Sequence, residues 1–68
     1  MKSIKLLVGK QISDARQAKG WLQRELAVAA GLPVRTIGRI ERGEVDVRLS
    51  TVAKIARALG VSLRDLLP

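Results

Sequence analysis

Regularly spaced glycines divide the sequence into short segments, and this spacing constrains the fold more than any other feature. They stand at Gly9, Gly20, Gly31, Gly43 and Gly60. Between them, apolar residues recur every three or four positions, which is typical of amphipathic helices. No stretch alternates apolar and polar residues as a half-buried strand does. We therefore expect an all-α fold of short helices that the glycines separate.

The first helix is predicted from apolar residues at i, i+4 and i+7, which are Val8, Ile12 and Ala15. Gly20 is placed to end this helix, and Ser3 is a candidate cap for an earlier start. The basic segment 1–7 is expected to be an arm or an extension of the helix. We prefer this to a membrane anchor because the segment is short and has few lysines.

Four further helices follow in the prediction, separated by short turns. Their expected positions are 23–30, 34–42, the stretch between a loop at 44–48 and Gly60, and a last segment that opens at Ser62. The last segment begins with a capping-box pattern, in which Asp65 takes the place of the usual glutamate. The chain is therefore expected to form one domain, residues 1–68, with a core at about 8–67.

The composition excludes several kinds of chemistry. The 68 residues include no Cys, His, Tyr or Phe, which removes disulfides, thiolate or imidazole metal sites, and catalysis by Cys or His. The carboxylates show no spacing that suggests a buried pair with shifted pKa values. We expect no enzyme activity, no metal, no cofactor and no small-molecule ligand. So short a chain is close to the lower limit for a self-sufficient core, so dimerisation is expected.

The charge balance points to a polyanionic partner. Thirteen Lys and Arg against six Asp and Glu give a net charge of +7, which attracts nucleic acid most often and membranes or acidic proteins less often. The sequence has neither a secretory signal nor an apolar run of membrane length. We therefore expect a cytoplasmic protein associated with the nucleoid.

The most informative segment is 23–42, where two predicted helices are joined by a tight turn at Gly31. Such a turn makes the helices cross steeply and demands a small residue at the crossing, which Ala27 supplies. Three arginines follow at i, i+4 and i+7 on the outward side of the second helix, and they are Arg35, Arg39 and Arg42. The planar fork of arginine can bind guanine in the major groove or grip a phosphate.

These residues resemble the helix-turn-helix of the phage Cro and repressor group, the lambdoid or XRE-like proteins. The matching segments are Gln23-Arg24-Glu25-Leu26-Ala27, residues 31–43, Leu49-Ser50-Thr51-Val52 and Ala58-Leu59-Gly60-Val61-Ser62. The resemblance covers the chain from Val8 onward. It implies a compact five-helix, lambda-repressor-like DNA-binding domain whose helix-turn-helix lies at about 23–42.

The resemblance also implies roles for particular side chains. The residues that would face base edges are Val34, Arg35 and Arg39. Those that would approach the DNA backbone are Gln23, Arg42 and Arg48. Arg16 and Glu41 match a family pair that forms a partly buried salt bridge between the first and third helices.

Three residues depart from the family pattern. Leu22 stands where a capping Ser or Thr is usual, so a cap typically worth about 1 kcal/mol is missing. Pro33 replaces a similar residue and is expected in the first turn of the third helix. Gly38 lies inside the recognition helix at a cost of about 1 kcal/mol relative to Ala, and it would allow a closer approach to DNA.

We predict a sequence-specific transcriptional regulator, a Cro-type repressor that binds a pseudo-palindromic operator in double-stranded DNA as a homodimer. One alternative is the antitoxin of a toxin–antitoxin pair that represses its own operon. Another is an interaction module that offers the arginines to an acidic protein. Trp21 is interpreted as a packing residue. Four apolar residues are left open between core and dimer surface, and they are Val45, Val47, Leu66 and Leu67.

Overall fold

The structure, a computed structural model, describes residues 3–68. The elements are α1 (Ile4–Ala18), α2 (Gln23–Ala30), α3 (Val34–Glu41), α4 (Leu49–Leu59) and the 3₁₀ helix η1 (Leu63–Leu66). No strand occurs within the described residues, and the all-α prediction is confirmed. In the same part of the chain, no helix is both long and apolar enough to cross a membrane.

Helix α1 begins earlier than its apolar pattern alone requires. Ser3 caps it, because the Ser3 Oγ accepts a hydrogen bond of 3.2 Å from the backbone N–H of Lys5. From Ile4 onward the basic N-terminal segment is thus an extension of the first helix. The part of the expected arm at residues 1–2 lies outside the described residues.

Gly9 does not separate two segments, unlike the other regularly spaced glycines, because the first helix continues through it. It is buried within α1, where the C-terminal end of α3 comes close. A Cβ atom at Gly9 would meet the carbonyl oxygen of Ile40 and lie 2.8 Å from that of Glu41. The missing side chain is therefore what lets the two helix backbones approach each other.

The turn between α2 and α3 is short and is held by its own backbone. Gly31 takes a left-handed conformation, with φ 70° and ψ 34°, and the next N–H, that of Leu32, donates to the Ala27 carbonyl at 2.9 Å. Pro33 precedes α3 as its N-cap instead of lying in its first turn. Arg42 is likewise the C-cap of α3, so the helix ends one residue before the predicted boundary.

The expected fifth α-helix is absent from the described residues, which hold four α-helices and the single 3₁₀ turn η1. The Asp65 carboxylate accepts the backbone N–H of Ser62 at 3.1 Å, so half of the predicted capping box is present. Leu67 is extended, with φ −101° and ψ 148°. It precedes Pro68, and a residue before proline disfavours the α conformation, so the turn cannot continue as an α-helix.

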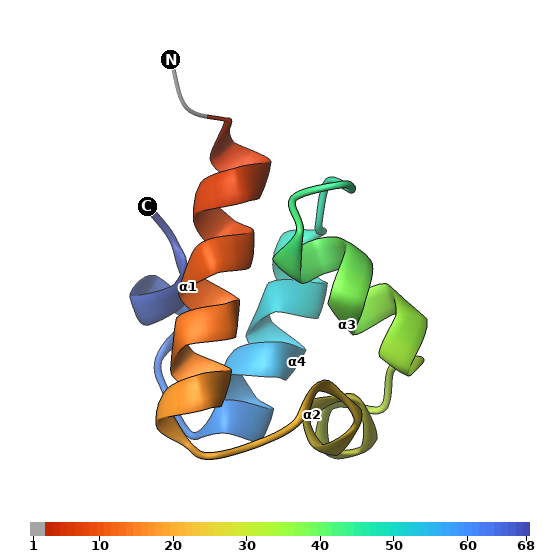
Figure 1. Ribbon diagram of the computed structural model, residues 1–68. Helices are drawn as coiled ribbons and strands as arrows, with labels where there is room; N and C mark the ends of the chain where they lie inside the picture. The colour runs from red at the N-terminus through yellow and green to blue at the C-terminus, as the bar shows by residue number, and fades with distance from the viewer. Residues whose placement is uncertain (1–2) are drawn as a thin grey trace.

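The core lies where all five elements meet. Its buried residues are Val8, Ile12, Leu26, Ala27, Ile37, Ile40, Val52, Ile55, Ala56, Leu59 and Leu66. Val45, Val47 and Leu67 are partly buried against them. In Figure 1, α1 and η1 lie on one side of the molecule and α3 on the other, with α2 seen nearly end-on below α3. This arrangement places α3 at the edge of the fold, where one of its sides faces outward.

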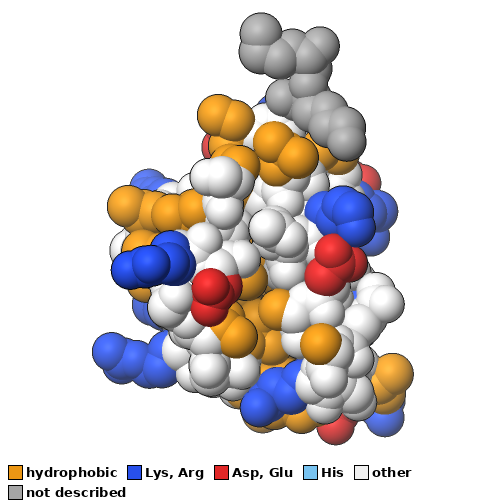
Figure 2. Space-filling view, turned by 90° about the vertical axis from the view of Figure 1, so that its left-hand side faces the viewer, with side chains coloured by type: hydrophobic (Ala, Val, Ile, Leu, Met, Phe, Trp, Pro, Cys, Tyr) orange, Lys and Arg blue, Asp and Glu red, His pale blue; other side chains and the backbone are white. Residues whose placement is uncertain are grey.

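Some large hydrophobic side chains remain outside this core. Ile4, Leu6 and Leu49 are more than half exposed. Ile4 and Leu49 line a groove together with Val47 and Leu67. Figure 2 views the molecule from the side of α1 and η1 and shows orange hydrophobic side chains near its upper end. The region joins the start of α1, the loop before α4 and the C-terminal tail into one surface.

Candidate nucleic-acid interface

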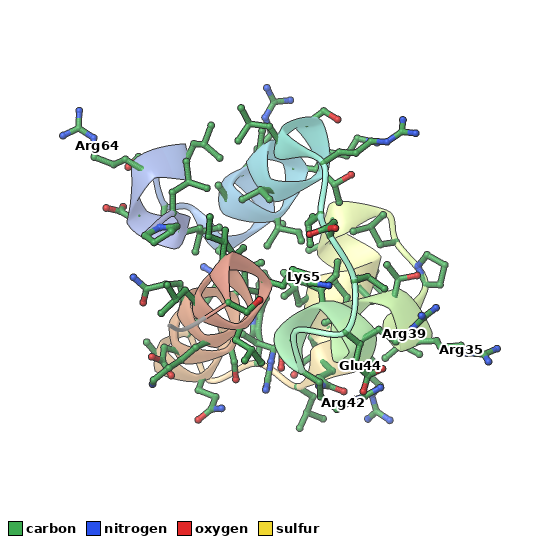
Figure 3. All side chains as sticks on the ribbon, turned by 90° about the horizontal axis from the view of Figure 1, so that it is seen from above. Lys5, Arg35, Arg39, Arg42, Glu44 and Arg64 are labelled. Atoms are coloured by element: carbon green, nitrogen blue, oxygen red, sulfur yellow. The ribbon has the colours of Figure 1, made fainter. Side chains whose placement is uncertain are left out.

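Helix α3 has two sides of opposite character. Ile37 and Ile40 are buried in the core, whereas Val34, Arg35 and Arg39 are exposed on the outward side. Seen from above in Figure 3, Arg35 extends well beyond the body of the protein, and Arg39 lies next to it on the same helix. The structure therefore brings the three side chains expected at base edges onto one accessible surface.

A partly buried ion pair fixes α3 against the rest of the fold. Arg16 on α1 donates from Nε and Nη2 to the two carboxylate oxygens of Glu41, at 2.7 and 3.1 Å. The side chains of Arg16 and Glu41 are only 13% and 5% exposed. Arg16 also donates from Nη1 to the Trp21 carbonyl at 2.6 Å. This bidentate geometry ties α1 to the last turn of α3 and to the segment before α2.

Gln23 joins the same network, although the resemblance assigns it a phosphate contact. Its Nε2 donates to the Glu41 carboxylate at 3.1 Å, so its amide links α2 to α3. Gly38 is buried beside it: a Cβ there would lie 3.5 Å from the Gln23 Oε1 and 3.1 Å from an Arg42 guanidinium nitrogen. Arg42 and Gln23 therefore cover Gly38, and its backbone does not form an open surface for DNA.

Sequence reasoning missed Glu44, which pairs with two of the predicted DNA contacts. Its carboxylate accepts the Nε–H of Arg42 at 2.6 Å and lies 3.8 Å from the Nε of Arg39. The hydrogen bond from Arg42 holds the pKa of Glu44 below its ordinary value, and the same bond raises the pKa of Arg42. The signal in the sequence is an acidic residue directly after the glycine that ends the arginine-bearing helix.

The N-termini of α2 and α4 have no capping side chain. Leu22 makes no such hydrogen bond, as predicted, but its own N–H donates to the Glu25 carboxylate at 2.8 Å. That acceptor was not foreseen from the sequence. Arg48 is the N-cap residue of α4. Its side chain is exposed and makes no capping hydrogen bond. Uncapped N–H groups beside a cation are suited to an anion such as phosphate.

Trp21 is a packing residue, in agreement with its interpretation from the sequence. It is partly buried against the core, and the ammonium of Lys19 lies 4.8 Å from the centre of its ring. Because its carbonyl accepts the hydrogen bond from Arg16, the residue fixes the junction between α1 and α2. Trp21 is thus part of the frame that supports α3.

Two short helices with a glycine turn, the second buried on one side and cationic on the other, define a helix-turn-helix domain. Comparison with known proteins gives the same class. The chain belongs to the helix-turn-helix family HTH_3, whose family model matches residues 12–66. That match covers both helices of the motif and most of the core around them.

Its relatives include transcriptional regulators of different lengths. The chain is 37% identical over 60 residues to the HTH-type transcriptional regulator PuuR of Escherichia coli, covering 88% of this chain and 32% of PuuR. It is 39% identical over 66 residues to the control protein C.BamHI of Bacillus amyloliquefaciens, covering 96% of this chain and 82% of that protein. The chain thus spans about a third of the first relative and most of the second.

A solved structure matches almost the whole chain. The restriction-modification controller protein C.AhdI of Aeromonas hydrophila superposes with a TM-score of 0.90 at 35% identity, covering 93% of this chain and 96% of that one. These relatives carry the names of regulators and not of enzymes. The expectation that this chain is not an enzyme is confirmed on that ground.

Proposed function

We propose that the chain is a sequence-specific DNA-binding transcriptional regulator that acts as a Cro-type repressor on a pseudo-palindromic operator, in the cytoplasm at the nucleoid. One observation carries the proposal: α3 exposes Val34, Arg35 and Arg39 on one side and anchors itself in the core with Ile37 and Ile40 on the other. An amphipathic helix of this length fits the major groove, where arginine reads guanine.

The proposed contacts divide into two kinds. Val34, Arg35 and Arg39 read bases, while Arg42 and Arg48 contact phosphates and contribute affinity without sequence preference. Gln23 contacts a phosphate through the second N–H of its Nε2, because its hydrogen bond to Glu41 uses only one of the two. Gly38 makes no DNA contact of its own in this proposal. Its missing side chain leaves room for the guanidinium of Arg42, which lies over it.

The proposal includes a homodimer. A 68-residue chain gains stability from association, and the surface of Ile4, Val47, Leu49 and Leu67 offers apolar area that the monomer leaves partly exposed. Substituting Leu49→Glu is expected to turn dimers into monomers in light scattering. The control is Val28→Glu, at a residue of α2 that is 83% exposed and distant in sequence from that surface. Equal masses for wild type and the Leu49 variant would refute this dimer surface.

The experiment that tests the function is selection from a random pool of duplex DNA at about 150 mM salt, followed by sequencing of the bound fraction. The expected result is an inverted repeat whose half-site centres lie about 10 bp, or ~34 Å, apart. If no sequence is enriched, specific DNA recognition is refuted, and capture of an acidic protein by the arginines becomes the better explanation. A partner that co-purifies at fixed stoichiometry would favour the antitoxin role instead.

Two variants separate base readers from phosphate contacts. Arg39→Ala is expected to relax the preference at one base position, at a cost of about 1–3 kcal/mol. Arg48→Ala is expected to weaken binding to all duplexes alike and to reduce the salt slope by about one. Binding isotherms on the selected operator and on single-base variants of it measure both. A uniform loss in both variants would refute the division.

A further inference from the structure

Glu44 occupies a defined place between two arginines at the end of α3. Figure 3 shows its side chain beside those of Arg39 and Arg42. The carboxylate accepts from the Nε of Arg42 at 2.6 Å and from its Nη2 at 3.5 Å, and it lies 3.8 Å from the Nε of Arg39. Arg42 is therefore bound by both carboxylate oxygens, whereas Arg39 is paired only through charge.

The backbone holds this carboxylate in position. Gly43 has φ 72°, its N–H donates to the Ile40 carbonyl at 3.0 Å, and the N–H of Glu44 donates to the Arg39 carbonyl at 3.0 Å. Together these bonds form the Schellman arrangement that ends a helix at a left-handed glycine. Glu44 is consequently fixed to the same helix end as the arginines, and its position does not depend on a flexible loop.

The ion pairs of Glu44 restrain the two arginine side chains in the free protein, but they are weak enough for a DNA phosphate to replace the carboxylate. All three side chains are about half exposed, and an exposed ion pair contributes little net free energy because water and salt screen it. A phosphate can therefore replace the carboxylate when DNA binds. Until then, Glu44 cancels one of the two positive charges and keeps the guanidinium of Arg42 over Gly38.

We propose that Glu44 is a positioning residue for specificity: it restrains Arg42 and lowers the attraction of this helix end to duplex of any sequence, so that the operator is favoured over other DNA. This inference rests on the DNA-binding function proposed above. Non-specific affinity depends on how many phosphates the protein neutralises. The carboxylate of Glu44 competes with phosphate for Arg42 and so reduces the non-specific affinity for DNA. At the operator, base contacts from Arg35 and Arg39 can offset this reduction.

The test compares Glu44→Gln with Asp46→Asn. Both remove one negative charge from the same loop, and Asp46 forms no ion pair among the described residues. Affinities are measured at about 150 mM salt for the operator recovered by selection and for a scrambled duplex. In Glu44→Gln, binding to the scrambled duplex should tighten about two- to fivefold, with a smaller change at the operator, so the ratio of the two affinities falls. In Asp46→Asn both affinities should shift alike, and the ratio should stay constant.

If the two variants change the affinity ratio equally, the positioning role of Glu44 is overturned. A wild-type protein that does not discriminate operator from scrambled duplex would instead refute the proposed function, and this is visible without any variant. An NMR measurement on the free protein tests the contact without DNA. The Nε–H resonance of Arg42 should move in Glu44→Gln and stay in place in Asp46→Asn, and a resonance that does not move in Glu44→Gln also overturns the inference.

Discussion

Removing the Glu41 carboxylate should destabilise the protein far more than removing an exposed charge. In Glu41→Gln, Arg16 loses its counter-ion while its side chain, only 13% exposed, keeps just two neutral acceptors, the new amide oxygen and the Trp21 carbonyl. Leaving a buried charge unpaired costs about 3–5 kcal/mol. A domain of this size has a total stability of about 3–10 kcal/mol. Much of the variant should therefore be unfolded at 37 °C.

The assay is urea unfolding followed by the helical circular dichroism signal, with stability taken from the midpoint and slope. Asp14→Asn is the matched control, because it breaks the exposed pair of Lys10 and Asp14 at 3.0 Å. Its expected cost is below about 0.5 kcal/mol. If the denaturation curves show dimer dissociation as well, protein concentration is held constant across the variants.

A double variant separates the cost of leaving one charge unpaired from the cost of losing side-chain packing. Arg16→Met combined with Glu41→Leu removes both charges and keeps apolar volume, so it should lose less stability than the sum of the two single changes by about 1–3 kcal/mol. The reasoning would be refuted if Glu41→Gln cost no more than Asp14→Asn. Strict additivity of Arg16→Met and Glu41→Leu would refute it as well.

Three further predictions concern a glycine inside α1, a glycine inside α3 and the ion pair at the end of α3. Gly9→Ala should destabilise the protein despite the higher helix propensity of Ala, because the new Cβ meets the Ile40 carbonyl, and thermal melting will show a lower Tm. Gly38→Ala should stabilise it by up to about 1 kcal/mol, since only the movable guanidinium end of Arg42 is in the way; a lower Tm would contradict this. Arg42→Gln should raise the pKa of Glu44 toward its ordinary value near 4.5, measured by NMR titration of the carboxyl. The contribution of that ion pair to stability is present above about pH 4.5 and is lost as the pH falls through the lowered pKa of Glu44.

The boundaries of α2 and the position of α4 could be predicted from sequence. The apolar spacing that indicates a helix and the glycine that ends it both lie within the segment itself. Gly31 and Gly60 both adopt the left-handed conformation that ends a helix. Gly9 is also a glycine but does not end a helix. It lies within α1 at the point where α3 approaches. Nothing in its neighbours along the chain indicates this, because the constraint comes from α3, about 30 residues away.

The site was predictable to the extent that a helix's own period fixes which residues share a side. Arg35 and Arg39 lie together because they are four positions apart. The hydrogen bonds of Gln23 and Glu44 were not foreseen, because each depends on how a flexible side chain meets a carboxylate brought near by the fold. Residue spacing predicts which side of a helix is outward, but it does not choose among several available partners.

The two-sided nature of α3 separates what the domain recognises from what keeps it folded. Val34, Arg35 and Arg39 take no part in the buried core, and the ion pair that orients the helix lies on its inner side. Substitutions at these outward positions therefore change little of the free energy of unfolding. In evolution or in the laboratory, a few substitutions on the outward side of α3 can therefore change the DNA sequence that the domain recognises while the fold is retained.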